Sequence, residues 1–252
     1  MLTVADTVTD TYAAAPFEVR TDIVELHTRV WHWLAQPGLW WTSEERIAIA
    51  AELRHAHRCE LCAKRKEDLS PYAIDGAHNV VSALPDPAIE AVHRISTDPG
   101  RLTEAGYRET LKGGVSDAAY VELVVIIACV VAVDTFVHAL GIPSFQLPEP
   151  VAGFPSRVRP EGAIQEGAWV PTIPLGGASP TEADLYNEGA VTNSYRAISL
   201  AAPQARMFFD IVATYYVDRH HITDPTFSSR AISRPQMEVI AARVSALNQC
   251  FF

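Results

Sequence analysis

The sequence predicts an all-α protein made of two helical parts, and three observations carry that prediction. Apolar residues recur at helical spacing along most of the 252 residues, and strand signals are weak. Short polar breaks separate the helical runs. The composition changes between Pro143 and Pro180, where eight of the seventeen prolines lie. We therefore expect domains at residues 1–142 and 181–252, joined by a Pro-rich linker or wrapping segment at 143–180.

The first helices are expected at residues 17–34 and from residue 43 to about residue 69. Apolar residues repeat at helical spacing in the first of these runs. Thr42 or Ser43 is a good N-cap for the second helix, because two glutamates follow in its first turn. A Ser-Pro step at residues 70–71 then ends that helix.

Two more helices are expected before the Pro-rich segment. Asp86 is the expected N-cap of one, with Pro87 in its first turn. The other is long, with Ser116 as its N-cap and Gly141 at its C-terminal end. Its apolar run, Leu123–Val133, is shorter than the roughly 20 residues of a membrane span, so we interpret it as a buried core helix.

In the second part, helices are expected at residues 193–200 and 203–217, and a last helix leads into Cys250. Ser233 is the expected N-cap of that last helix, and Pro235 lies in its first turn. The proline and the capping serine together predict a well-defined start for the helix.

The charge balance and the N-terminal sequence limit the partners and the location of the protein. The formal net charge is −10 and the pI is near 5.3. Such an acidic balance argues against a nucleic acid or an anionic membrane as the main partner. The first sixteen residues lack a basic region followed by an apolar one, so no secretory signal is visible and a cytoplasmic location is expected.

The four cysteines are not arranged as a disulfide framework. Cys59 and Cys62 form a Cys-x-x-Cys motif, Cys129 lies in the apolar run and Cys250 ends the last helical run. In a chain without a signal peptide, this pattern points to redox chemistry or metal binding. Cys129 is expected in the core.

A redox function is the favoured interpretation of Cys59 and Cys62. The nucleophile in such chemistry is the thiolate, and nearby cations favour it. The cationic or titratable side chains around the pair are His55, His57, Arg58, Lys64, Arg65 and Lys66. His78 is placed to reach back to the pair as a base after the turn at residues 70–71.

Two alternatives stay open for this pair. The cysteines could be inert members of the core. They could also bind zinc together with His55, since the three residues would share one face of a continuous helix and suit tetrahedral coordination.

The two cysteine-bearing runs resemble each other and indicate an internal duplication. Residues 44–59 align with residues 235–250, and both runs follow a Ser or Thr N-cap and end in cysteine. Within them, Ile-Ala-Ala at 49–51 falls on Ile-Ala-Ala at 240–242.

These residues resemble the AhpD-like family, which includes alkylhydroperoxidase D and carboxymuconolactone decarboxylases. Redox members of that family carry Glu, eleven residues, Cys-x-x-Cys, three residues and His. Glu238 and Cys250 match the first part of this spacing, and Cys59 with Cys62 matches the cysteine pair. The first half departs from the pattern, because Ile47 stands at the position of the Glu and Lys66 at that of the His.

The resemblance implies an all-helical fold of two AhpD-like units, the second incomplete, and a thiol-dependent peroxidase or disulfide oxidoreductase. Its catalytic residues would be Cys59, Cys62, Glu238 and Cys250, with Glu238 accepting the proton of the Cys250 thiol. The expected partners are a hydroperoxide, a thiol or dithiol electron donor and further copies of the chain, with no cofactor and no metal. The alternative is a non-redox decarboxylase-like or structural protein on the same scaffold.

The family spacing also leads to an expectation about the position after Phe252. The second cysteine of the Cys250 motif would fall there, and selenocysteine occurs in AhpD-like proteins as Cys-x-x-Sec. Selenocysteine is encoded by UGA, which ordinary translation reads as stop. We therefore expect a selenocysteine codon at that position; the competing accounts are an ordinary truncation and a degenerate second unit.

Overall fold

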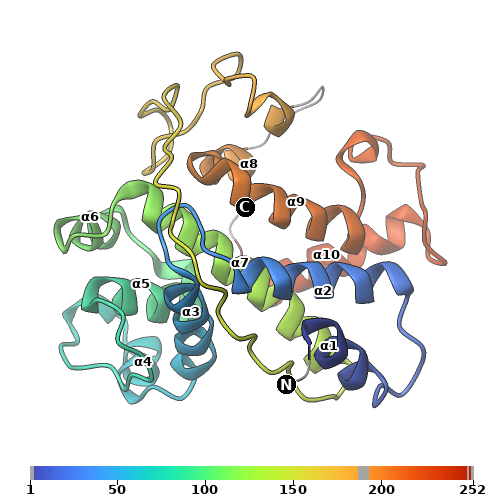
Figure 1. Cartoon of the computed structure of the whole chain (residues 1–252), viewed down its shortest axis with the longest axis horizontal. Helices are drawn as coiled ribbons and strands as arrows, with labels where there is room; N and C mark the ends of the chain where they lie inside the picture. The colour runs from blue at the N-terminus through green and yellow to red at the C-terminus, as the bar shows by residue number, and fades with distance from the viewer. Residues whose placement is uncertain (1–2, 187–192, 249, 251–252) are drawn as a thin grey trace.

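The computed structural model describes residues 3–186, 193–248 and 250, and it confirms the all-α class. Ten α-helices and no β-strand lie in these ranges, with one isolated antiparallel bridge between Ile164 and Thr172. Five short 3-10 helices connect the α-helices: η1 Pro71–Ala73, η2 Pro99–Arg101, η3 Ala183–Tyr186, η4 Ser199–Ala201 and η5 Arg219–His221. Figure 1 shows the helices gathered around α7, Asp117–Ala139.

Helix α7 is the centre of the hydrophobic core. Ser116 caps its N-terminus through a bond from the N–H of Ala119, and Gly141 follows its end with a positive φ of 71°, as the sequence predicts. Among the described helices it is the one long and apolar enough to cross a membrane, and most of its apolar window is buried inside the protein. Helices α2, α3, α5 and α9 all pack against it.

The N-terminal helices are α1 (Val4–Tyr12), α2 (Thr21–Ala35) and α3 (Ser43–Ala56). Helix α1 was not expected from the sequence, and α2 begins four residues later than expected. Helix α3 begins where the sequence predicts, because the Thr42 hydroxyl accepts the N–H of Glu45 and the Glu45 carboxylate accepts the N–H of Thr42.

The expected continuous helix from residue 43 to residue 69 is wrong. Helix α3 ends at Ala56, and a separate helix α4, Glu60–Glu67, begins after Cys59. The backbone of Cys59 is extended, with φ −75° and ψ 122°, so this residue is the N-cap of α4. The break turns the chain and places both cysteines at a helix start instead of in mid-helix.

The helices after α4 form the rest of this side of the molecule. They are α5, Asp86–Thr97, and α6, Glu104–Lys112, and α6 was not expected from the sequence. Helix α5 has Pro85 at its N-cap position, one residue before the expected Asp86. In Figure 1, α3 to α6 lie together on one side of α7.

The Pro-rich segment 143–180 is held against the helices rather than being a free linker, and its first part, residues 145–157, is an extended strap along α2 and α3 (Figure 1). The N–H of Val151 donates to the carbonyl of Ala35 at 2.9 Å, and its carbonyl accepts the Ser43 hydroxyl at 2.6 Å. Arg54 donates to the carbonyl of Phe145 at 2.9 Å. These bonds fix the course of the strap over α2 and α3.

The last helices are α8 (Asn193–Ala197), α9 (Ala202–Tyr215) and α10 (Arg234–Leu247). Ser233 forms a capping box with Gln236, which confirms the expected start of α10. Helix α9 packs on α2 and α7. Much of the apolar surface of α10 is exposed: Val239, Ile240, Val244 and Leu247.

A fully buried ion pair joins the first helices to α7 and α9. Arg46 Nη1 lies 2.9 Å from Glu122 Oε1, and neither side chain is appreciably exposed. Glu122 also accepts the N–H groups of Leu39 and Trp40, and Arg46 donates to Gln204 of α9. The network satisfies both charges inside the core.

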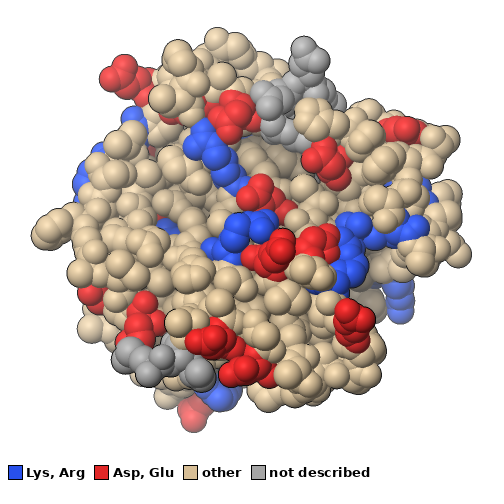
Figure 2. Space-filling model, turned by 45° about the vertical axis from the view of Figure 1, so that its right-hand side comes forward, with Lys and Arg blue, Asp and Glu red and all other residues tan. Residues whose placement is uncertain are grey.

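Charged side chains of both signs are scattered over the face of the molecule that Figure 2 shows. Figure 2 shows acidic and basic residues interspersed on one face of the molecule, so that face has no continuous field of one sign.

Candidate functional site

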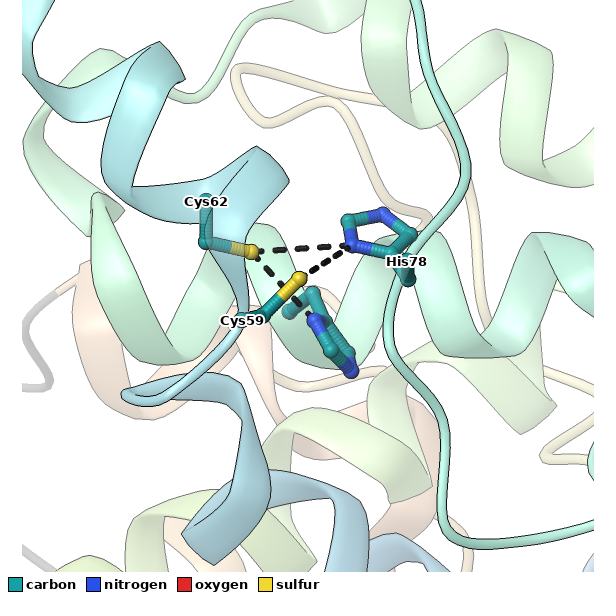
Figure 3. A group of neighbouring side chains, drawn as sticks. Cys59, Cys62 and His78 are labelled. Atoms are coloured by element: carbon teal, nitrogen blue, oxygen red, sulfur yellow. Dashed lines mark hydrogen bonds between the residues drawn. The ribbon is translucent and has the colours of Figure 1, made fainter.

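Four side chains from three segments meet on the α4–α5 side of the molecule. Cys59 and Cys62 come from the start of α4, His78 from the loop before α5, and His93 from α5 itself. Their two sulfurs and two imidazole nitrogens all lie within 4.8 Å of one another. Figure 3 shows the sulfurs of Cys59 and Cys62 pointing toward the ring of His78.

Three of the four sulfur–nitrogen distances in this group are close to one another. His78 Nδ1 lies 3.5 Å from Cys59 Sγ and 3.6 Å from Cys62 Sγ. His93 Nδ1 lies 3.3 Å from Cys62 Sγ. Both imidazoles thus present the same ring nitrogen, Nδ1, to the sulfurs.

Each imidazole meets a carboxylate on its other side. His78 Nε2 lies 2.7 Å from Glu90 Oε2, and His93 Nε2 lies 3.1 Å from Glu52 Oε2. A carboxylate that accepts the Nε2–H fixes the orientation and the tautomer of the ring. Both histidines are therefore held with Nε2 at a carboxylate and Nδ1 directed at the sulfurs.

The two carboxylates are themselves held by neighbouring donors. Glu90 accepts hydrogen bonds from Arg65 and Arg94. Glu52 is fully buried and accepts the N–H of Val81 at 2.8 Å. The loop that carries His78 is thereby tied to α3.

The electrostatics of the metal-free site favour a thiolate beside an imidazolium. Burial works against ionisation of Cys59, but the N–H of Cys62 and the ring of His78 lower the pKa of its thiol to about 7. Burial also works to lower the pKa of His78, but the sulfurs and Glu90 raise it to about 10. The Cys59 sulfur sits at the N-terminus of α4, where negative charge is favoured.

The pKa values of the other histidine and of the two carboxylates are also shifted, each for its own reason. Burial is the largest influence on His93, and its pKa lies below the usual value although Glu52 acts to raise it. Burial acts to raise the pKa of Glu90, but hydrogen bonds from His78, Arg94 and Arg65 hold it well below the usual range. Burial likewise opposes ionisation of Glu52, and hydrogen bonds from Ser82 and His93 outweigh it and lower the pKa.

The sulfurs are closed off from solvent. Cys59 is 1% exposed and Cys62 is 5% exposed. A cavity of about 660 Å³ lies next to the group, and its lining includes His78 and Glu90 but neither cysteine. A molecule in that cavity would meet the imidazole and the carboxylate before it met a sulfur.

The sequence found part of this site. His78 reaches back to the cysteine pair as expected. The reason for pairing His55 with the cysteines is wrong, because α3 ends before Cys59 and the three residues do not share one helix. His93, Glu52 and Glu90 were missed, although the position of Glu52 between the apolar residues Ala51 and Leu53 was a signal available in the sequence.

The remaining cysteines lie elsewhere. Cys129 is buried in α7 and free, which confirms its place in the core, and burial raises the pKa of its thiol well above the usual value. Cys250 is exposed and donates its N–H to the Ser245 carbonyl. The Glu238 carboxylate accepts hydrogen bonds from Tyr216 and Arg234. The pairing of Glu238 with Cys250 stays a prediction.

The expectation about the position after Phe252 lies outside the described residues, as do Gln249, Phe251 and Phe252 themselves. It therefore stays a prediction as well.

No protein-family model, no curated protein and no solved structure matches the chain. The resemblance to the AhpD-like family accordingly rests on the residues quoted above.

Proposed function

We propose that Cys59, Cys62, His78 and His93 form a four-coordinate zinc centre. The observation that carries the proposal is the paired orientation of the two imidazoles, each with Nδ1 at a sulfur and Nε2 at a carboxylate. Histidine ligands of metals almost always donate their other N–H to a carboxylate, a carbonyl or water.

The distances fit a tetrahedral ion. Zinc–sulfur bonds of about 2.3 Å and zinc–nitrogen bonds of about 2.0–2.1 Å put sulfur and nitrogen roughly 3.5 Å apart in a tetrahedron. Three of the four sulfur–nitrogen distances in the group are 3.3, 3.5 and 3.6 Å, and all four ligand atoms lie within 4.8 Å of one another. Two thiolates and two imidazoles suit zinc and disfavour hard cations such as magnesium and calcium.

The burial of the group supports a structural role for the ion. Structural zinc sites use four protein ligands, whereas catalytic ones keep a position open for water or substrate. Here all four ligands come from the chain, and both cysteines are buried. The ion would join α4, the loop of His78 and α5, and Glu52 would link this assembly to α3.

Metal analysis of the purified protein tests this proposal. After purification under reducing conditions, we expect one zinc ion per chain by mass spectrometry. Cobalt substitution should give the absorption bands of tetrahedral coordination, together with sulfur-to-cobalt charge transfer. The variants Cys62→Ser and His93→Gln should lose the metal, while Cys250→Ser, as the matched control, should keep it. Metal-free wild-type protein, or metal retained when Cys62→Ser and His93→Gln are combined in one chain, would contradict the proposal.

A second candidate function is the reduction of hydroperoxides by the Cys59–Cys62 pair. It is favoured by the position of Cys59 at the start of α4 with His78 3.5 Å from its sulfur. A thiolate would attack the peroxide bond to give a sulfenic acid and, after protonation, an alcohol. The other thiol would then displace water and form the disulfide. A thiol or dithiol donor would return the two electrons.

The two candidates differ in a direct measurement. Peroxide treatment of the metal-free protein should remove two hydrogens from the peptide that contains both cysteines if the redox function holds. Repeated consumption of peroxide with a dithiol donor would show turnover. Reduced thiols that persist under these conditions would leave the zinc centre as the function of the site.

The resemblance that supports the second candidate function also implies an arrangement of the chain into repeated units. We infer two AhpD-like helical units at residues 1–142 and 181–252, the second incomplete, assembled into a homo-oligomer. Two capping boxes at the starts of α3 and α10, the two aligned helices of the duplication, support the inference. Analytical ultracentrifugation tests the oligomer, and a compact monomer would contradict it.

A further inference from the structure

We propose that the cavity between α5 and α6 binds a small anion with an apolar body, and that Arg94 holds the anionic group. This proposal goes beyond the zinc centre and does not depend on it. The cavity measures about 660 Å³ and is lined by residues of η1, α5, α6 and α7. That size is typical of sites for small molecules.

Arg94 is the side chain that points to an anion. It is only 13% exposed, yet its terminal nitrogens, Nη1 and Nη2, have no hydrogen-bond partner among the described residues. Its Nε donates to Glu90, and its guanidinium lies 3.9 Å above the centre of the Tyr72 ring. The guanidinium is therefore fixed in position, with two donor groups left for a ligand at the cavity wall.

The charge balance around Arg94 leaves one positive charge in excess. Arg65 and Arg94 share a single carboxylate, that of Glu90, which is also the partner of His78. The other carboxylates of the lining, Asp86 and Glu109, are exposed residues, and Glu109 pairs with Lys112. Planar guanidinium groups bind carboxylates and related oxyanions through paired hydrogen bonds. A monoanion would complete the balance.

The rest of the wall indicates an apolar body for the ligand. Three tyrosine rings line the cavity, and those of Tyr107 and Tyr120 meet edge to face with centres 4.9 Å apart. Aliphatic side chains complete the wall: Ile89, Ile95 and Leu102. A Cβ at Gly106 would come within 2.9 Å of the Tyr72 ring, so the glycine leaves room for the ring under Arg94.

A pair of matched probes tests the proposal. 1-Anilinonaphthalene-8-sulfonate is an aromatic anion, and N-phenyl-1-naphthylamine is the same body without the sulfonate. Fluorescence titration should show saturable sulfonate binding to the full-length protein. Arg94→Met should lower the affinity for the sulfonate about tenfold or more, because it removes a charge-assisted hydrogen bond. It should change the affinity for the uncharged probe by less than about twofold. Arg108→Met, a change of an exposed arginine on α6, should alter neither.

A cavity-filling variant keeps the test decisive if Arg94→Met folds poorly. Ala105 is exposed and lines the cavity, so Ala105→Phe should weaken both probes while the thermal melt stays unchanged. Zinc content measured on the same samples separates a failure of the pocket from a failure of the metal centre. Equal affinity of wild type and Arg94→Met for the sulfonate, or of wild type and Ala105→Phe for both probes, would overturn the proposal.

Discussion

The Glu52 carboxylate lies 3.1 Å from Nε2 of His93, and both side chains are fully buried. This pair joins α3 to α5 directly behind the cysteines. Glu52 has no contact with the sulfurs among the described bonds, and its role at the site is to orient the imidazole.

Glu52→Gln should therefore weaken zinc binding while the protein stays folded. The amide keeps the shape of the side chain but loses the charge that holds the Nε2–H, and loss of such a partner typically costs about 10–100-fold in metal affinity. Competition with a chromophoric chelator measures the affinity. Glu60→Gln, at an exposed position in the first turn of α4, is the matched control. Equal affinities of the two variants would contradict the orienting role.

Removal of the metal should loosen one part of the chain selectively. Residues 68–85 hold only the short η1, and His78 connects this stretch to α4 and α5. We expect amide hydrogen exchange to speed up at residues 57–85 after chelation, and α7 to keep its protection because the core holds it. Exchange followed by mass spectrometry checks this. An even loss of protection over the whole chain would show that the metal holds more than this region.

The sequence predicted the helices with strong local signals. Caps at Thr42, Ser116 and Ser233 and the continuous apolar run of α7 are local features, and the structure agrees with each of them. The sequence at the break between α3 and α4 contains no glycine or proline that would indicate the end of a helix. At this break Cys59 takes the N-cap position of α4 with its sulfur 3.5 Å from His78 Nδ1, a tertiary contact that local helix propensity does not encode.

The site itself was only half visible in the sequence for a similar reason. Cys59 and Cys62 are close in the chain, and His78 follows a visible turn. His93 lies on the buried face of α5, thirty-one residues from Cys62. In the sequence it is one residue of a predicted helix, and nothing near it indicates a binding site. Only the packing of α3 against α5 shows that it meets a sulfur on one side and Glu52 on the other.

Loss of one partner of the buried Arg46–Glu122 pair should strongly lower the unfolding free energy of the protein. Arg46→Met leaves the Glu122 carboxylate without its ion partner inside the core, and such a change typically costs about 3–5 kcal/mol of unfolding free energy. Arg20→Met is the matched control, because the Arg20–Asp22 pair is about half exposed and should contribute at most about 1 kcal/mol. Urea unfolding measures both.

A double variant tests whether the two charges stabilise the protein through their mutual interaction. Arg46→Met combined with Glu122→Gln removes both charges, so it should be less destabilised than the sum of the two single variants. Strict additivity would show that the two charges act independently.

The buried His27 should make the stability of the fold fall in acid. Its Nδ1 lies 2.5 Å from the Tyr12 hydroxyl, and its Nε2 meets the Tyr215 hydroxyl of α9, so two neutral groups surround it. Burial lowers the pKa of His27 to about 4, whereas the unfolded chain has an ordinary value near 6.5. Between these values the unfolded state binds the extra proton, so the unfolding free energy decreases as the pH falls.

From pH 7.5 to pH 4.5 this group should remove about 2–3 kcal/mol of unfolding free energy, and above pH 6.5 it should have no effect. His27→Gln keeps a polar side chain between the tyrosines but cannot take up a proton in this range. Urea unfolding at the two pH values should therefore show a smaller loss in the variant. Other groups titrate over the same range, and acid would also release the proposed zinc ion, but both effects are common to the two proteins. The difference between the two losses of unfolding free energy therefore isolates the effect of His27. Equal losses in the two proteins would show that His27 has the same protonation state in the folded and unfolded chains over this pH range.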